Sequence, residues 1–482
     1  MTGTSPEERQ KPQLRWAVMF SMSLVVFGGY YVYDAISPLR GAMEAELGMG
    51  PTDFGWLVSF YSWPNILGIT ILGGILMDRK SVRFAGLIFT LLCVAGALLM
   101  AVGASEFFRR SALRGTLTDV VPGVSGELLV MIAGRVLFGF GAEVLIVAQN
   151  KVVARWFRDR ELALAFGLNL VVCRLGTFAA FNVSAAMVDG SRTFELVPSG
   201  TGLWVMASRY PGLSLTMWTA ACVMIASLGA FFVYAALDTL DRGPKETSDD
   251  VFRLSDLRDL VGNRTFLAIT LLGVFFYGAV FPFTSFATDI LQNKFGLSTH
   301  LAGALPSTVI LATIVGTPLG GLFIDRFGRR ATMMVVGSFL LMAVHLTLGL
   351  TMLTPIVPMI VLGLAFSLVP AAMWPSIPFL VPQRQLGTAF GIMGMLQNVG
   401  LWGVPILIGW VTEWSNPGVT AERVGQGTAA WDYTAALLLL ASLGGIAFVL
   451  ALRLRFAGRD EASRSLEFPH GSRDEKMVRP TS

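Results

Sequence analysis

Long apolar stretches alternate with short polar segments along nearly the whole chain. Each stretch provides the roughly 20 mostly apolar residues that an α-helix needs to cross a bilayer, and the sequence holds twelve of them. The first six are Arg15–Ser37, Phe54–Met77, Phe84–Ala104, Leu128–Asn150, Glu161–Met187 and Pro211–Leu237. The second six are Thr265–Leu291, His300–Ile324, Ala331–Leu350, Thr354–Val381, Thr388–Trp414 and Ala430–Leu454. This pattern predicts an all-α, polytopic membrane protein with twelve transmembrane helices.

A long polar segment, 238–264, separates the sixth stretch from the seventh. It divides the chain into two six-helix bundles, 15–237 and 265–454, with polar tails at 1–14 and 455–482. Within the segment, Leu254, Leu257 and Leu260 recur at three-residue steps. This spacing suits a short amphipathic helix on the membrane surface, and a plain linker is the alternative.

The composition indicates a surface that faces lipid. Hydrophobic residues make up 54% of the 482 positions and charged residues 14%, and the mean hydropathy is +0.64. Soluble domains carry roughly 25% charged residues, so this chain has too little charge to cover a surface that faces water. The net charge of +4 fits basic cytoplasmic loops better than nucleic-acid binding, and we expect no nucleic-acid partner.

Cysteine and histidine form no metal-binding or cofactor motif in this sequence. Cys93, Cys173 and Cys222 each lie within an apolar stretch, without the spacing of a disulfide framework or a metal site, and the three histidines are far apart. The sequence also lacks a nucleophile–base motif. We therefore expect no cofactor, no metal and no enzymatic activity.

Lysine and arginine are unevenly distributed between the two sides of the predicted helices. The short loops after the second, fourth and eighth helices are rich in them, with Arg79, Lys80, Arg83, Lys151, Arg155, Arg158, Arg160, Arg326, Arg329 and Arg330. The short loops on the other side hold Arg40, Lys294 and Arg423. Two longer loops, near Arg110 and Arg192, also carry arginines on this other side. The positive-inside rule is strongest for short loops, so these two loops weigh less. We therefore expect both tails and the linker to be cytoplasmic.

One sequence pattern occurs twice. Gly73–Arg79, which reads GGILMDR, returns 247 positions later as Gly320–Arg326, which reads GGLFIDR. Each copy ends the second helix of its half. Two like-built halves are typical of major facilitator transporters, and the pattern resembles the loop motif of that superfamily. We expect Asp78 and Asp325 to pair with arginines and to cap neighbouring helix ends, as a latch that holds one conformation.

Three ionisable residues lie deep within the predicted helices, where a charge costs about 2.5–3.5 kcal/mol to insert and marks a functional candidate. They are Arg135 and Glu143 in the fourth helix and Arg174 in the fifth. Arg135 opens a glycine-rich pattern that resembles the helix-four motif of proton-coupled superfamily members. It is either a structural arginine or a coupling residue that pairs with a carboxylate. Asp34 and Asp289 lie near the outer ends of their helices, so we expect both to be interfacial.

Glu143 and Arg174 form the sharpest candidate pair. Counted from the cytoplasmic ends of their predicted helices, they differ in depth by about 9 Å at 1.5 Å per residue. They either pair across the helices or hold the two ends of a zwitterion, with Glu143 on an ammonium group and Arg174 on a carboxylate. Other polar and aromatic residues suited to a pocket lie along the helices. These are Tyr30, Tyr31, Tyr33, Asn169, Tyr277, Trp374, Gln397 and Asn398.

Three segments, Ala148–Leu168, Met373–Pro378 and Gln385–Leu401, resemble the lysosomal dipeptide transporter branch of the superfamily and its prokaryotic relatives. The resemblance implies that Glu143 takes the amino end of a peptide and that Arg174 takes its carboxylate. Because the chain has no acidic dileucine sorting signal and no sequon in a lumenal loop, we expect a bacterial inner membrane rather than a lysosome.

The sequence therefore predicts a transporter of dipeptides or similar small zwitterions that works by alternating access, as a uniporter or coupled to protons. The rival is a proton-coupled transporter of small organic anions such as monocarboxylates. In that case Arg135 and Arg174 bind the anion and Glu143 carries the proton. We expect a monomer whose other partner is membrane lipid.

Overall fold

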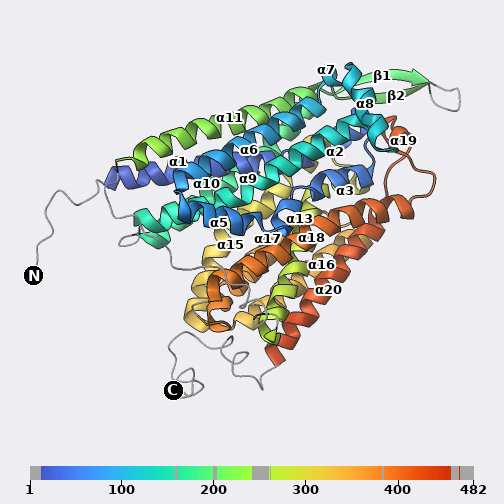
Figure 1. The fold of residues 1–482 in the computed structure, drawn as a ribbon. Coiled ribbons are helices and arrows are strands. Elements are labelled where there is room, and N and C mark those ends of the chain that lie inside the picture. The colour runs from blue at the N-terminus through green and yellow to red at the C-terminus, as the bar shows by residue number, and fades with distance from the viewer. Residues whose placement is uncertain are drawn as a thin grey trace, which may run out of the picture.

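Two bundles of helices lie against each other in the computed structural model, which describes residues 12–157, 161–198, 204–240, 260, 262–382, 385–456 and 466 (Figure 1). The first bundle consists of α1 (Pro12–Asp34), η2 (Ser37–Leu39), α2 (Arg40–Leu47), α3 (Pro51–Ser59), α4 (Trp63–Ile66), α5 (Ile69–Arg79), α6 (Val82–Gly103), α7 (Glu106–Arg109), α8 (Ala112–Val120), α9 (Gly126–Phe157), α10 (Leu162–Gly190), β1 (Thr193–Pro198), β2 (Trp204–Arg209) and α11 (Gly212–Asp238). The second bundle consists of α13 (Arg264–Phe295), α14 (Thr299–Ala304), α15 (Pro306–Phe327), α16 (Arg330–Leu350), α17 (Ile356–Met373), η3 (Trp374–Phe379), α18 (Leu386–Ser415), α19 (Ala421–Gly425) and α20 (Thr434–Phe456). Most of the polar segment between the bundles, including Leu254 and Leu257, lies outside the described residues.

Eleven stretches of the described residues are helical, long and apolar enough to cross a membrane. The remaining predicted crossing, Phe54–Met77, is broken into α3, α4 and α5. Pro64 lies in α4, and Gly68 adopts a φ of 84° between α4 and α5, a left-handed conformation that glycine adopts without strain. The broken helix supplies the twelfth crossing, and the predicted fold of twelve transmembrane helices in two bundles is confirmed.

A short β-hairpin interrupts the otherwise helical chain between α10 and α11. Its strands, β1 and β2, are antiparallel, with Thr193 opposite Arg209 and Pro198 opposite Trp204. An exposed ion pair of 2.9 Å joins Glu195 to Arg209. The sequence predicts a loop between two helices here, because a polar segment between two apolar stretches carries no periodicity long enough to predict strands.

Glycine lets helices of the first bundle approach closely. A Cβ atom placed on Gly96 of α6 would lie 2.5 Å from the carbonyl oxygen of Gly134 in α9. The reverse holds for Gly134, whose Cβ would lie 2.7 Å from the carbonyl oxygen of Gly96. Small residues that bring two backbones into contact are the usual basis of helix packing in membranes, so this glycine pair fixes the distance between α6 and α9.

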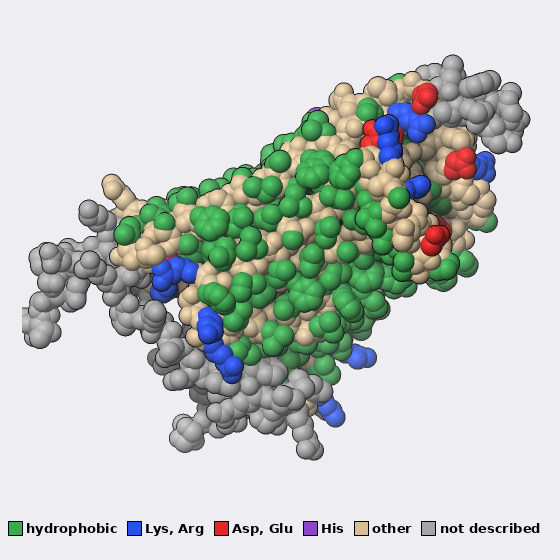
Figure 2. Space-filling model, turned by 45° about the horizontal axis from the view of Figure 1, so that its top comes forward, with side chains coloured by type: hydrophobic (Ala, Val, Ile, Leu, Met, Phe, Trp, Pro, Cys, Tyr) green, Lys and Arg blue, Asp and Glu red, His purple; other side chains and the backbone are tan. Residues whose placement is uncertain are grey.

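The two ends of the molecule differ in charge. The end where α1 begins and α20 ends is called the proximal end, and the opposite end, which carries α2, α19 and the hairpin, is called the distal end (Figure 1). Figure 2 shows hydrophobic side chains covering the flank between the ends. In that view the proximal end shows Lys and Arg side chains, whereas the distal end shows both signs of charge.

Polar links between the described residues of the two bundles cluster at the distal end. The Ser37 hydroxyl donates to the carbonyl oxygens of Thr284 and Ser285 in α13, each at 2.8 Å. The Thr52 hydroxyl donates to the Glu413 carboxylate in α18 at 2.7 Å. The bundles meet there, and their proximal ends diverge (Figure 1). The structure therefore shows the distal end closed.

Candidate functional site

A cavity that is partly open to its surroundings lies between the two bundles. The first bundle contributes Tyr30, Tyr33, Asp34, Arg174, Thr177 and Phe181, from α1 and α10. The second bundle contributes Val280, Phe281, Thr284, Val309, Ile310 and Phe366, from α13, α15 and α17. Arg174 is twelve residues from the start of α10 and sixteen from its end, so the cavity lies near the middle of the helices.

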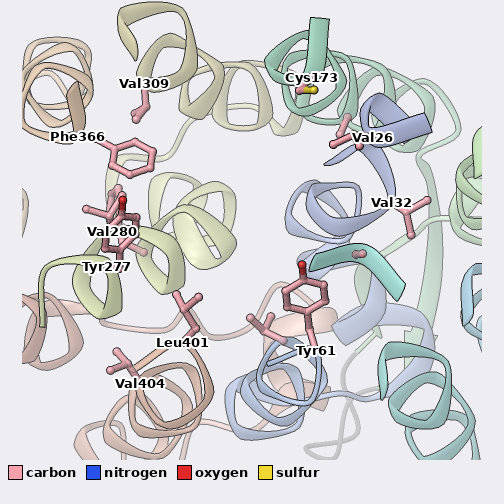
Figure 3. Packing of buried hydrophobic residues seen from close by; sticks show 14 of the residues in the cluster. Val26, Val32, Tyr61, Cys173, Tyr277, Val280, Val309, Phe366, Leu401 and Val404 are labelled. Carbon is pink, nitrogen blue, oxygen red and sulfur yellow. The ribbon is translucent and has the colours of Figure 1, made fainter. Parts of the chain in front are cut away.

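The two walls of this cavity differ in chemistry. Both of its charged groups, Asp34 and Arg174, belong to the first bundle. The second bundle presents aromatic and aliphatic side chains, with Thr284 as the polar exception. In Figure 3, Val309, Phe366 and Val280 lie together on one side, and Cys173 and Val26 lie across from them. The first bundle therefore forms the polar wall of the cavity, and the second bundle forms the apolar wall.

Arg174 reaches across the boundary between the bundles. Its guanidinium carbon lies 5.5 Å from the ring centroid of Tyr30 in α1 and 5.5 Å from that of Phe366 in α17, both within the range of cation–π contact. Within the described part of the chain, no carboxylate pairs with it. The planar guanidinium is therefore free to bind an anionic group, and a carboxylate fits its paired donors.

Glu143 projects from α9 and is half-buried. One of its carboxylate oxygens accepts a hydrogen bond of 2.9 Å from the Tyr61 hydroxyl. The ring of Tyr61 packs edge-on against Tyr33, at 4.5 Å between centroids, and Tyr33 lines the cavity. Glu143 is thus one aromatic layer behind the cavity wall, and its second oxygen has no partner among the described residues.

Glu143 and Arg174 lie at similar depth, which corrects the predicted difference of about 9 Å. Helix α9 runs to Phe157, beyond the predicted end at Asn150, because its polar segment stays helical. Glu143 is then fourteen residues from the end of α9, and Arg174 is twelve from the start of α10 at Leu162. Two residues amount to about 3 Å. The two side chains form no ion pair with each other in the described structure, so direct pairing, the simpler of the two interpretations, is wrong for this conformation.

Arg135 is fully buried in the first bundle, with 0% of its surface exposed. Its guanidinium donates to the carbonyl oxygens of Leu57 and Tyr33, each at 3.3 Å. It also lies 5.1 Å from the ring of Tyr33 and 5.6 Å from that of Tyr61. Among the described residues it pairs with no carboxylate and lines no part of the cavity. Of the two interpretations of Arg135, the structural arginine therefore fits these contacts, and the described structure shows no pairing with a carboxylate in this conformation.

The two outer aspartates are not interfacial, contrary to expectation. Asp34 ends α1 with 8% of its surface exposed and lines the cavity. Asp289, with 2% exposed, lies near Arg40 of α2. Both are covered because the chain after α1 stays helical through η2 and α2 and packs over them. For Asp34, the signal of burial in the sequence is Arg40, a second charge within the same long helical run.

Two predicted pocket residues of the first bundle lie away from the cavity wall. Asn169 is buried and accepts hydrogen bonds from the Ser23 hydroxyl, at 2.7 Å, and from the Gln149 amide. Tyr31 is also buried, on α1. These contacts stabilise packing between α1, α9 and α10, and neither residue lines the cavity.

The predicted pocket residues of the second bundle form a layer behind the wall. The Trp374 indole donates to the Tyr277 hydroxyl at 2.9 Å, and the Tyr277 ring stacks on Phe281 with 5.7 Å between centroids. The Asn398 amide donates to its own helix, at the Gly394 carbonyl oxygen, and Gln397 is half-buried. Tyr277 and Trp374 thus support the apolar wall, and the structure brings Gln397 and Asn398 into no contact with the cavity.

The repeated motif lies at the proximal end. Asp78 forms an ion pair with Lys151 of α9, so the expected arginine partner is wrong in this copy. Arg79 is exposed, and Arg326 lies over the ring of Phe327 at 5.4 Å. The side chain of Asp325 is outside the described residues. The first copy therefore ties α5 to α9 within one bundle.

The sequence profile described as the Major Facilitator Superfamily matches residues 19–290 and 271–477. The chain belongs to the major facilitator superfamily. This superfamily member is 29% identical over 405 residues to the lysosomal dipeptide transporter MFSD1 of Bos taurus, covering 83% of this chain and 80% of that protein. It is 22% identical to the probable galactarate/D-glucarate transporter GudP of Pseudomonas putida, over 84% of this chain and 87% of that one.

Solved structures give the same fold. The crystal structure of the nucleoside transporter NupG superposes with a TM-score of 0.66 at 12% identity, covering 91% of this chain and 99% of that one. The predicted family and its resemblance to the dipeptide transporter branch are confirmed. This superfamily member is a secondary transporter and a multi-pass membrane protein.

Proposed function

We propose that this superfamily member moves dipeptides or similar small zwitterions across the membrane by alternating access. The observation that carries the proposal is Arg174, a cation without a carboxylate partner in the described structure, in a cavity between the two bundles. The cavity lies near the middle of the helices, the depth at which transporters built from two like halves bind their substrates.

Arg174 takes the carboxylate of the substrate in this proposal, in a two-point contact through its parallel N–H donors. Glu143 takes the ammonium group, through the carboxylate oxygen that the Tyr61 hydroxyl leaves free. Glu143 and Arg174 are at similar depth, so a substrate that binds both of them lies across the bundle axis. This orientation supports the assignment of the ammonium group to Glu143 and of the carboxylate to Arg174. The dipeptide transporter named above supports the same substrate class.

Transport requires the distal end to open while the proximal end closes. The proximal end is cytoplasmic in this proposal, in a bacterial inner membrane, because basic side chains such as Arg83, Lys151 and Arg155 gather there. The transporter works as a uniporter or moves protons with its substrate. Acidification inside proteoliposomes on addition of substrate distinguishes proton coupling from uniport.

A small organic anion is the second candidate substrate. The likeness to the probable galactarate/D-glucarate transporter favours it, and Arg174 alone could bind a carboxylate. The contacts of Arg135 weaken this candidate, since its guanidinium is occupied by backbone carbonyl oxygens. In this case a screen for thermal stabilisation should select organic acids over dipeptides.

Uptake of alanyl-alanine by purified protein in liposomes tests the proposal. We expect Glu143→Gln and Arg174→Ala each to reduce uptake strongly, and Gln397→Ala, a polar change outside the cavity wall, to leave it unchanged. If both Glu143→Gln and Arg174→Ala transport the dipeptide at the wild-type rate, the site assignment is wrong. If the wild-type protein carries organic acids and no dipeptide, the second candidate replaces the first.

A further inference from the structure

Asp34 is a buried carboxylate in the cavity wall that has no role in the function proposed above. It is the last residue of α1, and 8% of its surface is exposed. No described residue forms an ion pair with it. A buried carboxylate is costly unless a cation or several hydrogen bonds compensate it. The charges of Arg174 and Arg135 act on Asp34 without forming an ion pair with it, and its position at the cavity lets it also accept a cationic group of a bound substrate.

The positions of Tyr30 and Arg174 relate Asp34 to the proposed site. Tyr30 precedes Asp34 by four residues and therefore lies on the same face of α1. The Arg174 guanidinium lies 5.5 Å from the Tyr30 ring, and Tyr30, Asp34 and Arg174 all line the same cavity. Asp34 and Arg174 thus present opposite charges to the same cavity.

This arrangement fits a zwitterion of two residues. The ends of an extended two-residue chain are about 6–7 Å apart, whereas the two charged groups of a single amino acid are separated by one α-carbon. An ammonium group has three N–H donors, so two carboxylates can each accept one of them. Asp34 and Glu143 supply two such carboxylates, and Arg174 supplies the cation for the other end.

We propose that Asp34 is a substrate-binding residue that shares the ammonium group of the zwitterion with Glu143, while Arg174 holds the carboxylate. This inference rests on the proposed function and adds a residue to that site. The neighbouring cation, Arg135, does not replace the substrate as the partner of Asp34, because its described contacts are carbonyl oxygens and aromatic rings.

Calorimetric binding of two ligands to the purified full-length protein tests the role of Asp34. Alanyl-alanine carries both charged ends, and propionyl-alanine has nearly the same shape and the same carboxylate but no ammonium group. We expect Asp34→Asn to raise the Kd of alanyl-alanine about tenfold to a hundredfold, the effect of losing one hydrogen bond to a charged group. The Kd of propionyl-alanine should stay unchanged.

Three further variants make the result specific. Gln397→Ala removes a polar side chain that lies outside the cavity wall and should leave both Kd values unchanged. Asp34→Glu keeps the carboxylate and should recover binding of alanyl-alanine relative to Asp34→Asn. The double variant Asp34→Asn, Glu143→Gln should lose less than the two single effects combined, because both carboxylates act on one ammonium group.

The outcomes separate this inference from the proposed function. If the wild-type protein binds alanyl-alanine and Asp34→Asn binds it equally well, Asp34 has no role in binding and the inference fails alone. Equal weakening of both ligands, without recovery by Asp34→Glu, shows a structural role and also overturns it. A wild-type protein that binds no dipeptide overturns the proposed function, and the inference with it.

Discussion

Arg40 of α2 and Asp289 of α13 lie 3.6 Å apart across the boundary between the bundles, with 1% and 2% of their side chains exposed. Each also has a partner in its own bundle. Arg40 pairs with Glu44 at 2.6 Å, and Asp289 accepts a hydrogen bond from the Tyr433 hydroxyl. Separation of the bundles therefore leaves neither charge without a partner, which suits a contact that breaks and re-forms during transport.

Neutralising Asp289 should favour opening of the distal end. Asp289→Asn removes the attraction to Arg40, while Arg40 keeps Glu44 as its partner.

A cysteine at Ser37, whose hydroxyl contacts α13, reports the opening in a background without the native cysteines. We expect a maleimide to label this cysteine severalfold faster in Asp289→Asn than in the parent. Glu195→Gln makes the same charge change at the same end, in the exposed hairpin, and should not alter the rate. Equal labelling in parent and Asp289→Asn would contradict a gating role.

Asp238 holds the proximal end of the first bundle together. With 5% of its side chain exposed, this residue at the end of α11 pairs with Arg83 at 3.4 Å and with Arg155, and it accepts from the Trp156 indole at 3.2 Å. We expect Asp238→Asn to lower the free energy of unfolding by about 1–3 kcal/mol, because it weakens bonds from three side chains at once. Thermal unfolding in detergent measures the loss.

Asp78 provides the matched comparison. Its ion pair with Lys151 is about one-third exposed on both sides, and an exposed pair contributes less than about 1 kcal/mol. Asp78→Asn should therefore leave the melting temperature nearly unchanged. A stability loss as large as that of Asp238→Asn would show that the motif is structural rather than a latch.

The length and polarity of each segment predict the fold because crossing a bilayer is a local requirement. All twelve crossings follow from apolar runs. Two features do not follow from apolar runs. The break at Gly68 depends on a single backbone conformation, and the hairpin that pairs Thr193 with Arg209 depends on pairing between two short segments.

The charged residues of the cavity wall could be predicted only where the charge lies inside an apolar helix. Arg174 was identified because such a charge is rare. Asp34 was missed because its depth depends on η2 and α2, which cover the end of α1. The depth of Glu143 was misjudged because α9 continues beyond the apolar run to Phe157. Which residues face the cavity depends on how the two bundles meet, and no single segment carries that information.

Close packing of α6 and α9 should be sensitive to one methyl group. A Cβ at Gly96 would lie 2.5 Å from backbone atoms of Gly134 and Phe138, so Gly96→Ala forces the helices apart. We expect a loss of about 1–3 kcal/mol, as for an overpacked core, seen as a lower melting temperature. Gly74→Ala is the control, because nothing lies within 4 Å of a Cβ there and alanine favours the helix by up to about 1 kcal/mol. Equal melting temperatures for the two variants would contradict the packing argument.

Arg135 and Arg174 should respond differently to the same substitution. Arg135→Lys loses the planar group that donates to two carbonyl oxygens and stacks on tyrosines. We expect a lower melting temperature and a lower maximal rate of dipeptide uptake, with KM unchanged. Arg174→Lys loses the two-point contact with a carboxylate, so KM should rise about tenfold while stability changes little. Initial rates of uptake over a range of alanyl-alanine concentrations separate the two effects. If Arg135→Lys raises KM as much as Arg174→Lys does, Arg135 contacts the substrate, and the organic-anion candidate with two arginines gains the advantage.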